Sequence, residues 1–169
     1  MFKKALVAAA LLSAMSMNVA HAADGTITFK GNIIAATCEV NGAAPGNIDV
    51  TLGDYSTSEV GVTGTTLGST QFDMALTGCP TGVDEVTMLF DGTADSTNGD
   101  VLKVTAATGV GIGIYETDGA KILINTPSKP ITLTSGDGTA SFVAKYVSTG
   151  DTVGAGDAGA VAQYTIQYR

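Results

Sequence analysis

Two cysteines, Cys38 and Cys79, are the residues of this chain best suited to covalent chemistry. They are its only cysteines, and an even number in an exported protein is typical of a disulfide bond. A shared metal ion and a reactive thiol are the alternatives. Two cysteines without a histidine make a poor zinc site, because structural zinc sites use four ligands. We predict a disulfide that closes a loop of about 40 residues, which the chain-entropy model values at on the order of 4 kcal/mol.

Several acidic residues have a spacing that could serve ion binding or hydrolysis. Asp91 and Asp95 lie two positions either side of a threonine, which resembles part of a calcium loop, but the glycine and closing glutamate of such loops are missing. Asp84, Glu85 and Asp118 could supply a glycosidase pair, yet nothing in the sequence brings two of them together. Acidic residues are also common in turns. We therefore predict solvated loops and neither a metal site nor a catalytic residue.

A glycine-rich run contains Gly109, Gly111 and Gly113. It resembles a phosphate-binding loop only loosely, since the lysine of that motif and a following helix are both missing. The run predicts a strand in which two backbones approach closely, and no nucleotide or other cofactor is expected.

The first 22 residues form a predicted secretory signal, Met1–Ala22. Lys3 and Lys4 give it a positive start, residues 5–15 are apolar, and a small-x-small cleavage pattern ends at Ala22. The apolar stretch is too short for a bilayer, which needs about 20 residues, so no membrane insertion is expected. The remainder is long enough for one domain with its own core.

Charge and composition exclude several classes of protein. Removal of Lys3 and Lys4 leaves six basic residues against 16 acidic ones, which argues against nucleic acid or an anionic membrane as a partner. The only histidine, His21, leaves with the signal. A histidine-dependent triad or metal site is therefore excluded from the mature protein, and many hydrolases with it.

Beyond the signal, apolar and polar residues alternate with the period of β-strands, separated by turn residues. Short strands at this spacing predict a β-sandwich. The expected strands cover residues 33–40, 64–77, 85–90, 101–106, 110–115, 121–125, 131–134, 139–147 and 161–168.

Both ends of the mature chain carry this alternation, although chain ends usually fray. One parity at the front contains Gly25, Ile27, Phe29, Gly31 and Ile33, while Thr26, Thr28, Lys30 and Asn32 take the other. Ala162, Tyr164, Ile166 and Tyr168 share a parity at the C-terminal end, which closes with Arg169. Both ends therefore have the pattern of strands that can enter a sheet, which favours a self-assembling building block over a catalyst.

These features together resemble the pilin subunits of chaperone–usher fimbriae, especially the type 1 fimbrial major subunit. The resemblance covers nearly the whole mature chain and depends on the order of several weak motifs. They are Phe29-Lys30-Gly31 before the first cysteine, the Cys38–Cys79 spacing, Gly109–Tyr115, Ala144-Lys145-Tyr146, Gly156-Asp157-Ala158 and the terminal Tyr164-x-Ile166-x-Tyr168.

The resemblance implies an all-β fold, an incomplete immunoglobulin-like sandwich that lacks its last strand. In this family a periplasmic chaperone fills the resulting groove first, and the N-terminal extension of the next subunit fills it in the fibre. The implied partners are further copies of the chain, related fimbrial subunits, the chaperone and an outer-membrane usher. The implied route leads from the periplasm to a surface fimbria, with residues 1–22 as signal, 23–33 as donor-strand extension and 34–169 as pilin domain.

The resemblance also implies roles for the two alternating ends. The donor strand would insert Gly25, Ile27, Phe29, Gly31 and Ile33 into a neighbour. Ala162, Tyr164, Ile166 and Tyr168 would face the core and border the groove, and the carboxylate of Arg169 would meet basic residues of the chaperone. An ordinary first strand and a plain C-terminal core strand are the structural alternatives.

The sequence thus predicts a structural, non-enzymatic subunit of an adhesive surface fimbria that polymerises head to tail. A minor adaptor subunit is the alternative within the family. A secreted, monomeric carbohydrate-binding sandwich is the alternative outside it, but the chain has no tryptophan and aromatic residues make up only 6% of it, whereas sugar sites usually expose aromatics.

Overall fold

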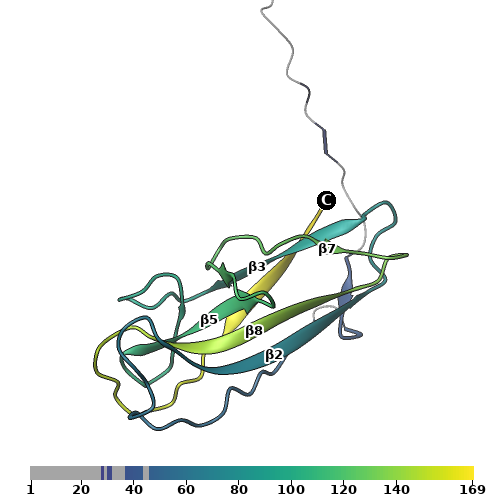
Figure 1. Cartoon of the computed structure of the whole chain (residues 1–169). Helices are drawn as coiled ribbons and strands as arrows, with labels where there is room; N and C mark the ends of the chain where they lie inside the picture. Colours follow the sequence, from purple (N-terminus) through teal and green to yellow (C-terminus); the bar gives the residue numbers. More distant parts are fainter. Residues whose placement is uncertain (1–27, 29, 32–36, 44–45) are drawn as a thin grey trace, which may run out of the picture. The chain divides into compact units, whose positions relative to one another are not determined.

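The computed structural model describes residues 28, 30, 31, 37–43 and 46–169. The chain divides into two units, residues 1–33 and 34–169. In the first unit the described residues are Thr28, Lys30 and Gly31, and all three are exposed. All strands of the described part lie in the second unit (Figure 1).

Two antiparallel sheets make up the second unit. The larger sheet has the order β1-β2-β8-β5-β4, and β6 also pairs with β5, while the smaller sheet has the order β7-β3-β9. Figure 1 shows β2, β8 and β5 side by side, with β3 and the yellow β9 in a separate layer. The strands are β1 (Glu39–Val40), β2 (Thr66–Thr77), β3 (Glu85–Gly92), β4 (Leu102–Lys103), β5 (Val110–Glu116), β6 (Lys121–Ile122), β7 (Ile131–Thr132), β8 (Gly138–Ser148) and β9 (Ala162–Tyr168).

The long strands agree with the sequence prediction, and the short ones correct it. β1 contains only Glu39–Val40 of the predicted strand 33–40, whose residues 33–36 lie outside the described part. After β1 the chain turns at Asn41 and Gly42, which both have positive φ, the geometry of a tight hairpin turn.

Three predicted strands are cut to two residues by competing backbone bonds. The chain leaves β4 because the amides of Thr105 and Ala106 bond to the 157–159 loop. It leaves β6 toward Asn125, which has a φ of 61° and donates its amide to the carbonyl of Phe90. It leaves β7 for the turn around Ser135, which has a φ of 54°.

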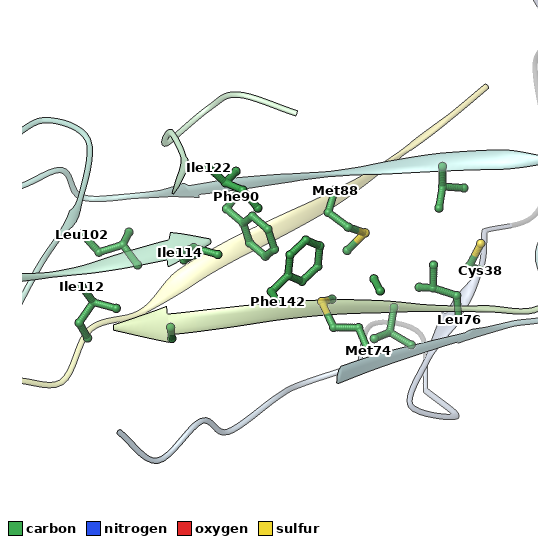
Figure 2. Close-up of a cluster of buried hydrophobic side chains, with 14 of the residues drawn as sticks. Cys38, Met74, Leu76, Met88, Phe90, Leu102, Ile112, Ile114, Ile122 and Phe142 are labelled. Atoms are coloured by element: carbon green, nitrogen blue, oxygen red, sulfur yellow. The ribbon is translucent and has the colours of Figure 1, made fainter. Parts of the chain in front are cut away.

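The core lies between the two sheets. Phe142 of β8 meets Phe90 of β3 edge to face, with ring centroids 5.0 Å apart. Figure 2 shows the two rings next to each other, with the side chains of Met74 and Met88 beside Phe142. These side chains are almost fully buried, and burial of each contributes roughly 1.5–3 kcal/mol. The alternation seen in the sequence therefore places one face of each long strand in a shared core.

A disulfide joins Cys38 to Cys79, with an S–S distance of 2.06 Å, and both residues are buried. It ties the segment before β1 to the end of β2, so the predicted bond is present. In the described part of the chain, no helix has the length and apolar character needed to cross a membrane.

Candidate functional site

The strand β9 lies at the end of the smaller sheet, where β3 is its one pairing partner among the described residues. The carbonyls of Met88 and Phe90 in β3 bond away from β9, to the amides of Ser128 and Asn125. In an antiparallel ladder, two residues that lie opposite each other without exchanging hydrogen bonds both point their N–H and C=O groups away from the partner strand. Met88 and Phe90 lie opposite Ile166 and Tyr164. The backbone groups of these two residues therefore point to the open side of β9.

The side chains of β9 alternate as the sequence predicts. Tyr164, Ile166 and Tyr168 are half-buried and pack against the core, while Gln163, Thr165 and Gln167 are exposed. Ala162 was predicted to face the core with them, but it is exposed at the start of β9, so this part of the prediction is wrong. Arg169, predicted to meet the chaperone, is also exposed. The half-burial of three large side chains means that an apolar surface reaches solvent along this edge.

A second extended segment, residues 46–52, has the same alternation. Ile48, Val50 and Leu52 are half-buried against the core, while Asn47, Asp49 and Thr51 are exposed. No backbone hydrogen bond joins this segment to another described residue. This segment is not among the predicted strands, although the period-two pattern of Ile48, Val50 and Leu52 is a usable signal.

Two tyrosines of β9 reach the N-terminal part of this unit. The Tyr164 hydroxyl donates to the backbone carbonyl of Gly46 at 2.5 Å, and the Tyr168 hydroxyl accepts from the backbone amide of Cys38 at 3.0 Å. β9 and the start of segment 46–52 are therefore neighbours, joined through a side chain and not through a ladder. We call the open side of β9 together with residues 46–52 the accepting edge.

A cavity of about 530 Å³ lies at one end of the accepting edge, next to the end of segment 46–52 and the start of β9. Residues 53–57, which follow segment 46–52, line it together with residues 153–159, which precede β9. Tyr55 and Tyr146 meet in it edge to face at 6.0 Å. Burial raises the pKa of Tyr146, and the nearby carboxylates of Asp54 and Asp157 raise it further. The cavity is thus a partly apolar pocket with acidic walls.

The acidic residues of two other sequence motifs make local contacts. The carboxylate of Asp95 accepts hydrogen bonds from the backbone amides of Thr97 and Asn98 and so stabilises the turn in which it lies. Asp118 pairs with Lys129. Among the described residues, no cluster of three or more His, Cys, Asp or Glu side chains is placed to hold a metal ion.

The predicted close approach in the glycine-rich run is confirmed at Gly111. A Cβ at this position would lie 2.9 Å from the carbonyl oxygen of Leu102 in the neighbouring strand. Gly111 and Gly113 lie in β5, and Gly109 directly precedes this strand with a φ of 70°.

Comparison with known sequences decides the family. The sequence pattern of the fimbrial protein family matches residues 27–169. The chain belongs to the fimbrial protein family. It is 36% identical to a type-1 fimbrial protein subunit of Serratia marcescens, over 99% of each chain. It is 32% identical to the long polar fimbria protein A of Salmonella typhimurium, over 99% of this chain and 98% of that one.

Solved structures agree with the fold of this fimbrial protein. The antigen and type I fimbria protein of Burkholderia pseudomallei superposes with a TM-score of 0.62 at 33% identity, covering 79% of this chain and 90% of the other. The P pilus rod subunit PapA superposes with a TM-score of 0.66 at 20% identity, covering 79% of this chain and 100% of PapA. The immunoglobulin-like sandwich expected from the resemblance is therefore the fold of this chain.

Family membership identifies the chain as a structural fimbrial subunit, a class whose members build extracellular pili. Of the residues predicted to form the donor strand, Gly25, Ile27, Phe29 and Ile33 lie outside the described part. Gly31 is described and exposed.

Proposed function

We propose that this fimbrial subunit polymerises by donating residues 25–33 of one copy to the accepting edge of the next. The inserted strand lies between β9 and residues 46–52 and completes the smaller sheet. Each copy offers one donor and one acceptor that differ from each other. Such head-to-tail contacts do not close and so produce a filament.

The open side of β9 is the observation that carries this proposal. Ile166 and Tyr164 direct their backbone groups to that side, and half-buried side chains follow the same edge. An unpaired edge beside apolar surface is a template for another strand and an aggregation hazard when left uncovered. The proposed strand satisfies the backbone groups and covers the apolar surface at once.

The donor residues fit this edge chemically. Ile27, Phe29 and Ile33 share one parity, and burial of each contributes roughly 1.5–3 kcal/mol. Gly31 lies on the same parity and allows a close approach of two backbones. The cavity at the end of the accepting edge offers space for one large apolar side chain of the donor.

A subunit with this edge uncovered needs protection before assembly. We propose that a periplasmic chaperone covers the edge after removal of residues 1–22, and that an outer-membrane usher receives the complex. The carboxylate of Arg169 lies at the exposed end of β9, where chaperone basic residues can reach it. The subunit itself has no catalytic role in this scheme.

Paired substitutions in the donor segment test the proposal. Ile27→Asp/Phe29→Asp places charges on the inserted face, and we expect it to abolish fimbriae while the subunit still accumulates in complex with its chaperone. Thr26→Asp/Thr28→Asp adds the same charge to the opposite face, and we expect fimbriae to form. Electron microscopy of whole cells and native gels of periplasmic extracts measure the two outcomes. Normal fimbriae from the first variant would contradict the proposal.

A further inference from the structure

The accepting edge carries very little charge on its solvent side. The exposed row of β9 contains Gln163, Thr165 and Gln167, none of which is charged. On the other side, Asn47, Asp49 and Thr51 form the exposed row, and only Asp49 is charged. Asp49 makes no ion pair or side-chain hydrogen bond with another described residue. Its carboxylate is the one acidic side chain in these two exposed rows.

The donor segment carries one charge on its matching face. Thr26, Thr28, Lys30 and Asn32 form the outward row, and Lys30 is exposed. Between Lys4 and Lys103 the sequence contains no other lysine or arginine. The donor therefore brings the positive charge of Lys30 to an edge whose exposed rows contain one acidic side chain, Asp49.

Strand geometry allows these two charges to meet if Lys30 lies opposite or diagonal to Asp49. Residues directly opposite on neighbouring strands have Cβ atoms about 5 Å apart, and diagonal neighbours are about 7–8 Å apart. A lysine side chain spans either distance. Beside Gln163, Thr165 and Gln167, Lys30 would meet neutral side chains, and the charges of Arg169 lie past the end of β9. Asp49 is therefore the one acidic side chain in the two exposed rows.

We propose that Lys30 of one subunit pairs with Asp49 of the next and fixes the register of the inserted strand. This inference rests on the proposed strand donation. A slip of one residue would turn Lys30 into the core and is excluded by the buried face. A slip of two residues keeps the apolar face buried but moves Lys30 toward Asn47 or Thr51. The charge pair distinguishes registers that the apolar pattern alone leaves similar.

A charge swap in assembled fimbriae tests the pair. Lys30→Glu or Asp49→Lys replaces attraction by repulsion, and we expect each to speed dissociation of fimbriae in guanidinium about two- to tenfold. The double variant restores an opposite pair, and its dissociation rate should return to near that of the wild type. Because the pair is exposed, the difference between single variants and wild type should shrink when sodium chloride is added.

Asp73→Lys is the matched control. Asp73 is exposed on β2 of the larger sheet, and its replacement changes the net charge by the same amount as Asp49→Lys. We expect its dissociation rate to remain near that of the wild type. An equal acceleration by Asp73→Lys would assign the effect to net charge and overturn the pair.

The outcomes separate this inference from the strand donation beneath it. If Ile27→Asp/Phe29→Asp abolishes fimbriae but the double charge swap is no slower to dissociate than the single variants, the ion pair is wrong and donation stands. If Ile27→Asp/Phe29→Asp still assembles, both fall. Should a charge-reversed variant yield no fimbriae, the neutral variants Lys30→Gln and Asp49→Asn give the same test. Their effects must be less than additive in the double variant if the pair exists.

Discussion

Tyr164 and Gly46, which are 118 positions apart in the sequence, are joined by a hydrogen bond from the tyrosine hydroxyl to the glycine carbonyl. Gly46 is buried, and Tyr164 lies on the open strand β9. This contact connects β9, which forms one side of the accepting edge, to the first residue of segment 46–52, which forms the other side.

Tyr164→Phe should therefore destabilise the subunit. The variant keeps the ring but leaves the buried carbonyl of Gly46 without its partner, which costs about 1–3 kcal/mol. Urea unfolding of the purified subunit measures the change in the free energy of unfolding. Tyr55→Phe is the control, because Tyr55 is 42% exposed and its hydroxyl has no hydrogen-bond partner among the described residues. Equal stability of the two variants would show that the Tyr164 bond contributes little.

The disulfide should supply a large share of the stability. Cys38→Ser/Cys79→Ser removes a link across 41 positions, for which the chain-entropy model gives about 4 kcal/mol. Both cysteines are buried, so serine also brings polar atoms into the core. Periplasmic yield and the urea midpoint should both fall sharply. An unchanged midpoint would mean that the fold does not depend on this link.

Gly111 is a site where the packing forbids a side chain. In Gly111→Ala the new methyl group meets the Leu102 carbonyl and the Val101 side chain, and overpacking of this kind costs about 1–3 kcal/mol. Gly99→Ala is the matched control, since nothing lies within 4 Å of the added atom there. Thermal unfolding compares the two. A destabilisation of the same size in Gly99→Ala would point to backbone effects instead of the contact with β4.

Alkaline pH should weaken the fold through two tyrosines. Burial raises the pKa of Tyr115, and burial with the nearby carboxylates raises that of Tyr146. A raised tyrosine pKa favours the neutral phenol in the folded state, so its contribution to stability is complete below about pH 10 and is lost as the pH rises through the folded-state pKa.

Ultraviolet absorbance of tyrosinate, followed with pH, checks this expectation. Tyr115→Phe/Tyr146→Phe should lack the component that ionises at the highest pH. Its urea midpoint should also depend less on pH above about 10 than that of the wild type. A titration curve that differs only in amplitude would place these two phenols in ordinary solvent-like surroundings.

Much of the architecture was predictable from local pattern. Phe72, Met74 and Leu76 alternate with polar residues, and they form the inward row of β2 as expected. The paired cysteines and the motifs around Tyr164 and Tyr168 also indicated the family before any fold was known. These signals are local because side-chain direction in a strand follows the position in the chain.

Other features depend on contacts that the sequence does not encode locally. The predicted strands at 101–106, 121–125 and 131–134 shrink to two residues because distant or turn-forming backbone groups compete for their hydrogen bonds. Segment 46–52 has a strand's alternation, yet it pairs with no described strand.

The sequence by itself determined which side chains alternate, which cysteines can bond and which family the chain resembles. Only the tertiary structure decided that, within the described part of the chain, β9 pairs on one side alone, that Tyr164 contacts Gly46 and that Asp49 is exposed beside this edge. The physical reason is distance along the chain. Alternation is set by neighbouring residues, whereas an open edge is defined by which remote strands come beside it.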